Sequence, residues 1–308
     1  MIPVLYDTIY THKVGVTMND PASHPVINDI SSKLDSLTPK AQTLGTYIMQ
    51  NPSKAVFMTT KELAETCEIS EATVVRFVST LGYNGYSEFQ EALKDFVNTG
   101  LSLPERAAIK GIKEPGTDRL HRGILEELNN LKYLYEHINI ETMTQFVDHL
   151  DKSHTVYVVG SRLSYTFAYY LGWSLTKVRK GVHILKGSDS TTFDMLTNAH
   201  PESLVILAAT SRYPNELIKL SKMIRRSSHT LLTMTDSSIC PVIQFADLSL
   251  VVPSRSIPFI GNVSGMLAVI QFMVQELANR RGEDLANYQK QLEQVYLEND
   301  ILFNLEPK

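Results

Sequence analysis

The chain has 308 residues, which is more than one hydrophobic core usually organises, so its length predicts two domains. With 43% hydrophobic residues, 20% charged residues and a net charge of −4, its composition is that of an ordinary globular protein and gives no indication of a nucleic-acid partner. No apolar run approaches a membrane span and the start lacks a secretory signal, so we expect a cytoplasmic protein without a membrane partner.

The cysteine content argues against a disulfide framework or a zinc site. Cys67 and Cys240 lie far apart, and neither has His or Cys neighbours at metal-ligand spacing. We expect both to be buried as small apolar residues. The sequence predicts no metal and no cofactor.

The first part of the chain is predicted to form short amphipathic helices with clear caps. Residues 1–25 show no sustained hydrophobic period, and we expect them to be partly disordered. A helix is then predicted to begin at Thr38, which proline follows, and to stop at Asn51 before another proline.

The next two helices have the spacing of a helix-turn-helix. Thr59 and Glu62 stand at the spacing of a capping box and begin the first helix. Ser70 can cap the second, which is predicted to run to Leu81 and to end at Gly82, a residue suited to a left-handed cap. Two short helices joined by about four residues are typical of the helix-turn-helix motif.

The second helix of this pair has one apolar side and one polar side. At 100° per residue, the apolar side carries Val74, Phe77, Val78 and Leu81. The other side carries Ala72, Thr73, Arg76, Ser79 and Thr80. Small and hydrogen-bonding groups around one arginine let a helix approach base edges while the guanidinium reaches guanine or phosphate. Periodicity alone equally allows a plain amphipathic helix in a bundle.

The stretch from "NPSKAVFMTTKELAE" through "S-ATVVRF" to "LGY-GY-EF" resembles the amino-terminal helix-turn-helix domain of the RpiR family of bacterial transcription regulators. The resemblance implies that the helix beginning at Ser70 is the recognition helix and enters the major groove of a double-stranded DNA operator. The DNA-contacting residues are then expected to be Lys61, Ser70, Ala72, Thr73, Arg76, Ser79, Thr80 and Tyr83.

Acidic side chains outnumber basic ones between Ser31 and Asn98. Phosphate contacts supply much of protein–DNA affinity, so this domain alone should bind DNA weakly. We expect dimerisation, backbone amides at helix ends, or later basic residues to add affinity. The later basic residues are Arg106, Lys110, Lys113, Arg119 and Arg122.

Changes in composition and hydrophobic pattern along the chain suggest the domain boundaries. Glycine, proline and mixed charge mark a linker. We place a helix-turn-helix domain at 27–98, a linker at 99–117, a ligand-binding domain at 118–280, and a carboxyl-terminal helix with a possible dimer contact at 281–308.

The ligand-binding domain is predicted to be an α-β-α sandwich. The runs "TVYVVG", "SLVILAA", "HTLLTMT" and "ADLSLVV" have the apolar character of buried parallel strands, and helical stretches lie between most of them. The predicted fold class is therefore an all-α helix-turn-helix domain followed by an α/β domain whose parallel sheet is flanked by helices.

Two loops are predicted to follow strands at the edge where such sheets bind ligands. "GSRLS" follows the first strand and "ATSRYPNE" follows the second predicted one, and each precedes a helix. Hydroxyls, helix amides and guanidinium groups together suit a phosphate or carboxylate. The candidate ligand-binding residues are Ser161, Arg162, Ser164, Thr210, Ser211, Arg212 and Glu216. Alternatively, the arginines point to solvent or bind carboxylates at a subunit contact.

This half of the chain resembles the sugar isomerase (SIS) domain, which in RpiR regulators senses phosphorylated sugars. The second loop of such domains is usually similar to "S-SG-T-E". Ser211 and Glu216 match that pattern, whereas Ala209, Arg212 and Pro214 depart from it. A carboxylate bound by arginine is therefore as compatible with these loops as a sugar phosphate.

The carboxyl-terminal part indicates assembly. "GNVSGMLAVIQFMVQELANR" is apolar on most sides, which suits a helix between the sheet and a partner subunit. Leu285, Tyr288, Leu292 and Val295 then recur at helical spacing, as either core or dimer contact. A homodimer or a dimer of dimers would match the two half-sites expected of a helix-turn-helix regulator.

The leading hypothesis is a DNA-binding transcription regulator controlled by a small anionic metabolite, without catalytic residues. The alternative is a sugar-phosphate isomerase or lyase with an accessory helix-turn-helix, which needs a general base. The candidate bases are Glu216, Asp194, His183 and His200. A third hypothesis is a ligand-binding module that acts through protein contacts.

Overall fold

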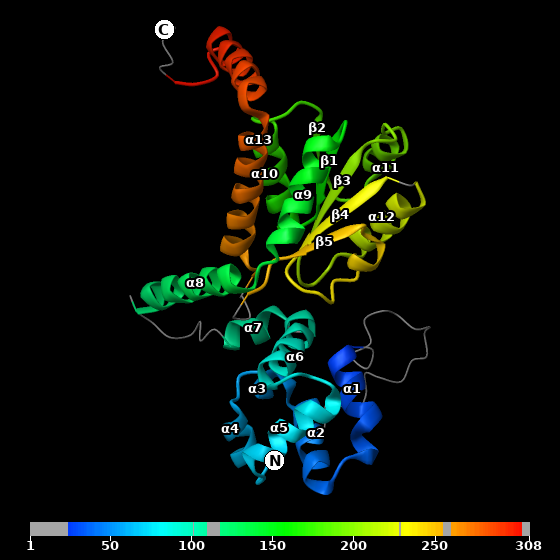
Figure 1. Ribbon diagram of the computed structural model, residues 1–308, viewed down its shortest axis with the longest axis vertical. Helices are drawn as coiled ribbons and strands as arrows, with labels where there is room; N and C mark the ends of the chain where they lie inside the picture. The colour runs from blue at the N-terminus through cyan, green and yellow to red at the C-terminus, as the bar shows by residue number, and fades with distance from the viewer. Residues whose placement is uncertain (1–23, 101, 110–117, 228, 255–259, 304–308) are drawn as a thin grey trace. The chain divides into compact units, whose positions relative to one another are not determined.

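The computed structural model describes residues 24–100, 102–109, 118–227, 229–254 and 260–303. The chain divides into two compact units, Met1–Leu101 and Ser102–Lys308 (Figure 1). Residues 1–23, most of the segment expected to be partly disordered, lie outside the described residues.

Helices build the described part of the first unit. They are α1 (Pro25–Lys33), a 3₁₀ turn (Leu34–Ser36), α2 (Pro39–Gln50), α3 (Pro52–Ala55), α4 (Thr60–Thr66), α5 (Glu71–Leu81) and α6 (Tyr86–Gly100). The predicted capping box is present, because the Thr59 hydroxyl accepts the amide of Glu62 while the Glu62 carboxylate accepts the amide of Thr59. The Ser70 hydroxyl caps α5, and Gly82 ends it at a φ of 106°, in the left-handed region.

The apolar side of α5 forms the centre of this unit, as its spacing predicts. Val74, Phe77, Val78 and Leu81 are buried. Phe77 meets Phe89 of α6 edge to face, with ring centroids 6.1 Å apart. The Lys33 ammonium donates to the carbonyl oxygens of Thr80 and Leu81, where a positive charge stabilises the carboxyl end of α5.

The second unit is built on a parallel sheet. Its helices are α7 (Leu103–Ile109), α8 (Asp118–His137), α9 (Ile140–Lys152), α10 (Leu163–Leu175), α11 (Ser190–Thr197), α12 (Asn215–Arg226) and α13 (Val263–Glu298), with a 3₁₀ turn at Ile243–Phe245. Its strands are β1 (Val156–Gly160), β2 (Val182–Lys186), β3 (Leu204–Ala209), β4 (Thr230–Thr235) and β5 (Leu248–Val251), in the spatial order β2-β1-β3-β4-β5. All four pairings are parallel, as predicted.

Helices cover both faces of this sheet (Figure 1). Val156 and Val158 of β1 pack with residues of α9, α10 and α13, while the alternate residues Tyr157 and Val159 pack with residues of α11 and α12. A strand buried on both faces needs apolar residues throughout, which is why β1 and β3 are continuous apolar runs. The α-β-α sandwich predicted from the sequence is confirmed.

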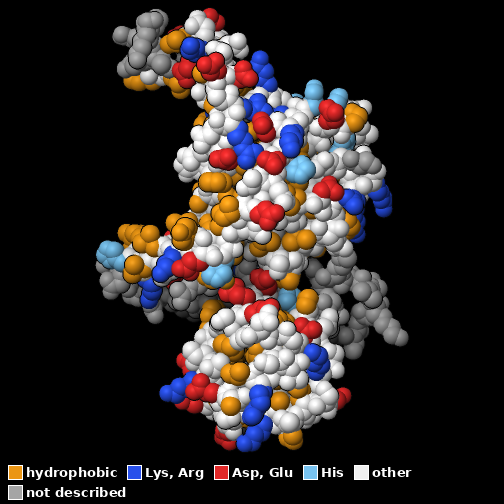
Figure 2. Space-filling model, viewed as in Figure 1, with side chains coloured by type: hydrophobic (Ala, Val, Ile, Leu, Met, Phe, Trp, Pro, Cys, Tyr) orange, Lys and Arg blue, Asp and Glu red, His pale blue; other side chains and the backbone are white. Residues whose placement is uncertain are grey.

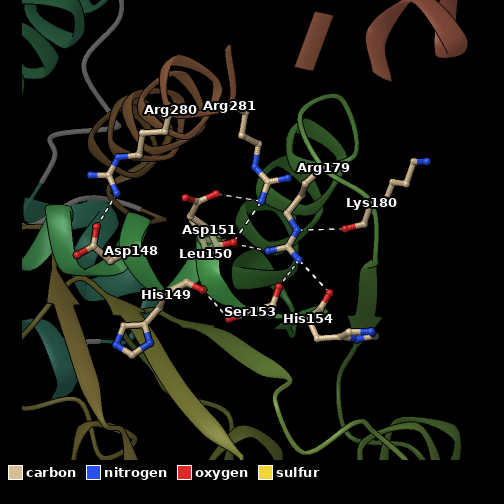
Figure 3. Close-up of polar contacts among 10 residues, drawn as sticks. All are labelled: Asp148, His149, Leu150, Asp151, Ser153, His154, Arg179, Lys180, Arg280 and Arg281. Atoms are coloured by element: carbon tan, nitrogen blue, oxygen red, sulfur yellow. Dashed lines mark hydrogen bonds and ion pairs between the residues drawn. The ribbon is translucent and has the colours of Figure 1, made fainter. Parts of the chain in front are cut away.

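The buried Arg179 links the end of α9 to the segment that precedes β2, at the amino edge of the sheet (Figure 3). The Arg179 guanidinium donates to the carbonyl oxygens of Leu150, Ser153 and His154 at the end of α9, and its Nε donates to that of Lys180. The carbonyls at a helix end have no intrahelical donor, and Arg179 supplies several at once. Burial lowers the pKa of Arg179 to about 10.

The long helix α13 is attached to α9 and then breaks. Arg280 pairs with Asp148 and Arg281 with Asp151 (Figure 3). The next residue, Gly282, has φ 46° and ψ −123°, which interrupts the helix. After the break, Tyr288 donates to the carbonyl of Thr176 at 2.8 Å, so the distal half of α13 packs against the end of α10.

The structure differs from the sequence predictions in several segments. Helix α7 lies inside the segment predicted as a linker, part of which, residues 110–117, lies outside the described residues. Helix α10 ends at Leu175, and β2 and α11 were not predicted. Both cysteines are buried, as expected. Among the helices of the described residues, none is long and apolar enough to cross a membrane.

Candidate DNA-binding and effector sites

The polar face of α5 is presented as the sequence predicts. Ala72, Arg76, Ser79 and Thr80 are exposed and Thr73 is half-buried. Val75, which the sequence analysis did not include, is also exposed on this helix. An apolar side chain among small polar ones suits contact with a thymine methyl group.

The hydroxyl groups on α5 are already oriented by the helix. Ser79 donates to the carbonyl of Val75 at 3.1 Å, and Thr80 donates to that of Arg76 at 2.8 Å. A hydroxyl that donates in this way still has oxygen lone pairs that can accept a hydrogen bond. These two side chains can therefore accept from an exocyclic amine of cytosine or adenine, while Arg76 donates.

Of two other residues predicted to contact DNA, Lys61 is exposed and Tyr83 is packed within the unit. Lys61 is exposed on α4, 4.0 Å from Glu65. The Tyr83 hydroxyl donates to Asp29 at 2.9 Å, its ring packs edge to face on Phe89, and burial raises its pKa. Packing within the unit therefore accounts for Tyr83, and its hydroxyl is not presented with the α5 residues.

One basic residue expected to assist DNA binding is buried instead. Arg106 on α7 is 3% exposed and lies within electrostatic reach of Asp236, which raises its pKa, and of Arg212, which lowers it. Burial lowers the pKa of Arg106 more than either neighbour changes it. Arg106 is therefore not placed to contact phosphate, whereas Arg122 is exposed on α8. Lys110, Lys113 and the side chain of Arg119 lie outside the described residues.

The two predicted ligand loops lie side by side at the carboxyl edge of the sheet. Strands β1 and β3 are neighbours in the sheet, with Val159 opposite Leu207. The Ser164 hydroxyl lies 3.0 Å from that of Thr210 and accepts the Thr210 amide at 3.1 Å. Both side chains are buried, so this pair fastens the two loops to each other.

A second link joins the first loop to the start of α12. The Ser161 hydroxyl donates to the Glu216 carboxylate. Glu216 also lies against Gly187, the residue after β2, and a Cβ on Gly187 would come within 3.1 Å of its carboxylate oxygen. Gly187 has a φ of 72°, so both the backbone conformation and the lack of space for a side chain favour glycine at this position.

The structure adds a residue that the sequence analysis missed. Asp236 follows β4 directly, is buried, and accepts the Ser211 amide at 2.9 and 3.0 Å, the Ser211 hydroxyl, and the Tyr213 hydroxyl at 3.3 Å. Burial raises the pKa of Asp236, against the effect of these hydrogen bonds. Its position immediately after the apolar run "HTLLTMT" was the signal that could have revealed it.

The two arginines of the loops share an unusual backbone conformation. Arg162 has a φ of 52° and Arg212 a φ of 65°, in a region that favours glycine, and both are exposed. Strained residues of this kind cluster at functional sites. Neither arginine takes part in the links that Ser161, Ser164 and Ser211 make with their partners.

The candidate catalytic bases do not gather at this edge. His183 lies on β2 and stacks on Tyr157 with centroids 4.9 Å apart, near the amino ends of the strands. His200 precedes β3 and stacks on His154 at 4.4 Å. Asp194 lies on α11, whereas Glu216, in the first turn of α12, accepts a hydrogen bond from Ser161 of the first loop.

Comparison with known families matches both units. Residues 25–100 match the helix-turn-helix domain of the rpiR family, and residues 149–276 match the SIS domain. The chain combines an rpiR-type helix-turn-helix domain with a SIS domain. Relatives of this RpiR-type chain include an HTH-type transcriptional regulator of Clostridium perfringens, 20% identical over 80% of this chain and 88% of that protein. Another is the HTH-type transcriptional regulator HexR of Pseudomonas aeruginosa, 21% identical over 87% of this chain and 94% of HexR.

Solved structures share the fold of the RpiR-type chain. The Vibrio vulnificus NanR protein complexed with ManNAc-6P is 17% identical, with a TM-score of 0.51 over 91% of this chain and 100% of that one. The sugar isomerase domain of an RpiR transcription factor from Sphaerobacter thermophilus is 23% identical, with a TM-score of 0.53 over 56% and 96% of the two chains. These likenesses establish the α/β fold of the second unit.

Proposed function

We propose that the protein is a transcription regulator that binds a double-stranded operator through α5, with an affinity controlled by a small anionic metabolite. The observation that carries this proposal is the combination, in one chain, of an rpiR-type helix-turn-helix and a SIS domain. The exposed polar face around Arg76 supports the DNA-binding part. The relatives named as regulators over most of their length support it further.

The effector site is proposed to lie at the carboxyl edge of β1 and β3. Arg162 and Arg212 extend from neighbouring loops, and two guanidinium groups can each donate paired hydrogen bonds to a phosphate or carboxylate. The NanR structure is a complex with ManNAc-6P, a sugar phosphate, which makes that class the first to test. The departures at Ala209 and Pro214 make related carboxylic acids the second class.

This site is proposed to bind without turnover. An isomerase needs a base that is free to take a proton from the sugar. Glu216 accepts the Ser161 hydroxyl, and Asp236 accepts three donors from Ser211 and Tyr213, so both carboxylates are used in linking the loops. Turnover of a sugar phosphate by purified protein, lost in Glu216→Gln, would favour the isomerase or lyase alternative.

The protein is further proposed to act as a homodimer or a dimer of dimers. Two copies would present two α5 helices to two half-sites and would compensate for the acidic excess of the first unit. Exposed apolar residues near the carboxyl terminus support a contact there. They are Val295, Ile301, Leu302 and Phe303.

The experiment that tests the function has two parts. A thermal-shift screen of sugar phosphates and related acids identifies the effector, and fluorescence anisotropy with DNA selected from genomic fragments measures operator affinity with and without it. We expect affinity to fall as salt rises, and to change at saturating effector. If DNA binding is neither sequence-selective nor salt-dependent, the better hypothesis is a ligand-binding module that acts through protein contacts.

A further inference from the structure

A polar cavity lies at the amino edge of the sheet, away from the loops of the proposed effector site. It has a volume of about 440 Å³ and lies between the end of α9, the segment before β2 and the part of α13 that follows the break at Gly282. This volume is within the range of about 300 to 1,000 Å³ that small-molecule pockets have. Figure 2 shows basic side chains, with acidic ones among them, gathered over this part of α13.

Two guanidinium groups lie close together in the wall of this cavity. Arg179 is 4% exposed and donates to carbonyl oxygens at the end of α9, while Arg281 donates to Asp151 at 3.0 Å. Figure 3 shows the two arginine side chains next to each other. Burial lowers the pKa of Arg179, and the nearby charge of Arg281 lowers it further. Because the two like charges repel, a negative charge in the cavity would stabilise both.

Arg281 has donor groups that the described residues do not use. Its hydrogen bonds to Asp151 all come from Nη2. Within the part of the chain that the structure describes, Nε of Arg281 is buried and meets no acceptor. A guanidinium has five N–H donors, and a buried donor without an acceptor is rare and points to a bound ion or molecule. An oxyanion in the cavity would supply acceptors for this side chain.

The other lining residues also favour an anion. The Lys180 ammonium lies 5.7 Å from the centroid of the Tyr288 ring, and both residues line the cavity. The side-chain amides of Asn287 and Gln291 are further possible donors on α13. Among the described lining residues, Asp284 is the one acidic side chain, against two arginines and a lysine.

We propose that this cavity is a second ligand site, which binds a small molecule through a phosphate or pyrophosphate group held by Arg281 and Lys180 beside Arg179. A phosphate offers several acceptor oxygens and up to two negative charges, whereas a monocarboxylate offers two oxygens and one charge. Such a ligand would connect α9 and the segment before β2 with the part of α13 beyond its break. None of the residues of the proposed effector site takes part.

Calorimetry of the full-length protein with pyrophosphate tests the site. The double variant Arg162→Ala, Arg212→Ala removes the proposed anion contacts at the carboxyl edge, so the binding that remains comes from elsewhere in the protein. We expect it to be saturable, with a dissociation constant below about 1 mM. Added to this background, Arg281→Gln should weaken binding about tenfold or more, as the loss of a charge-assisted hydrogen bond does.

Arg280→Gln is the matched control for Arg281→Gln. Arg280 is the neighbouring residue, its side chain is 27% exposed against 28% for Arg281, and it also pairs with an aspartate of α9, Asp148. It does not line the cavity, so Arg280→Gln should bind pyrophosphate like the background. Equal binding by the two arginine variants would overturn the proposal.

Two exposed residues of the rim give a test that does not depend on the arginines. Asp284→Asn removes the opposing charge and should strengthen binding by up to about fivefold, and Lys180→Gln should weaken it by a similar factor. All variants should keep the helical circular dichroism of the parent. The proposal is also overturned if Asp284→Asn binds no more tightly than the background, or if the parent binds pyrophosphate and the double variant does not. The latter result would assign the anion to the carboxyl edge alone and would leave the proposed function intact.

Discussion

Replacing Arg162 with glycine should strengthen the fold while it weakens effector binding. Arg162 has φ 52° and ψ −128° at the start of α10, and its side chain makes no capping hydrogen bond there. A non-glycine residue held in such a region costs about 1 to 3 kcal/mol, whereas glycine loses about 0.5 to 1 kcal/mol of additional backbone entropy on folding. The net gain for Arg162→Gly is therefore about 1 kcal/mol, or roughly 2 to 4 °C in the unfolding midpoint of a unit of this size.

The same substitution removes one guanidinium from the proposed anion site. A charge-assisted hydrogen bond contributes about 1.5 to 3 kcal/mol, so the effector dissociation constant should rise about tenfold to a hundredfold. Arg162→Ala separates the two effects, because it loses the same contact but keeps the strained backbone. Glu68→Gly is the matched control in the first unit, since Glu68 is exposed with a φ of 52° and lies outside the effector site.

Urea unfolding measures the stability of each variant, and calorimetry with the effector from the thermal-shift screen measures its effector affinity. We expect Arg162→Gly to be more stable than Arg162→Ala, both to bind effector weakly, and Glu68→Gly to bind it normally. If Arg162→Gly is the less stable of the pair, the strain argument is refuted. If both Arg162 variants bind the effector like the parent, the anion contact is refuted.

Three further predictions concern other residues. Arg76→Ala should weaken operator binding by about 1 to 3 kcal/mol without loss of fold, and unchanged anisotropy at fixed salt would contradict the placement of α5. Arg179→Met should lower the free energy of unfolding of the second unit by about 3 kcal/mol, because a buried carbonyl and two part-buried ones lose their donor. A loss below about 1 kcal/mol by urea titration would show that water replaces the guanidinium. Burial raises the pKa of Asp236 above 3.8, so its contribution to stability is greatest at low pH and is lost as pH rises through the folded-state pKa. The free energy of unfolding, measured in urea from pH 4 upwards, should therefore decline less in Asp236→Asn than in the parent. An identical pH profile in the two proteins would contradict this prediction.

The sequence was sufficient for elements whose ends carry specific chemistry. Thr59, Ser70 and Gly82 each use a local hydrogen bond or backbone preference, so the bounds of α4 and α5 follow from short-range rules. Strands β1 and β3 are buried on both faces, and their continuous apolar runs reveal them. The half-exposed edge strand β2 lacks such a run, and its sequence "VHILK" gave no comparable signal.

The candidate site was only partly predictable for a different reason. The loops after β1 and β3 could be located because each lies next to a recognisable strand. The partners of their hydroxyls could not, since Ser211 and Asp236 are 25 residues apart and meet only when β3 pairs with β4. The burial of Arg106, which was expected to assist DNA binding, could not be foreseen because it depends on the tertiary packing of α7, which composition does not encode.

At the proposed effector site, the links between the serines and the two carboxylates would make effector binding an exchange reaction. An anion that uses the hydroxyls of Ser161 and Ser211 must first displace the carboxylates of Glu216 and Asp236, which are then brought close to a like charge. Asp236, whose pKa burial already raises, is the carboxylate that would take up a proton in that situation. Binding at this edge would thus be coupled to proton uptake, and the affinity of the regulator for its metabolite would report the acidity of its surroundings as well as the metabolite's concentration.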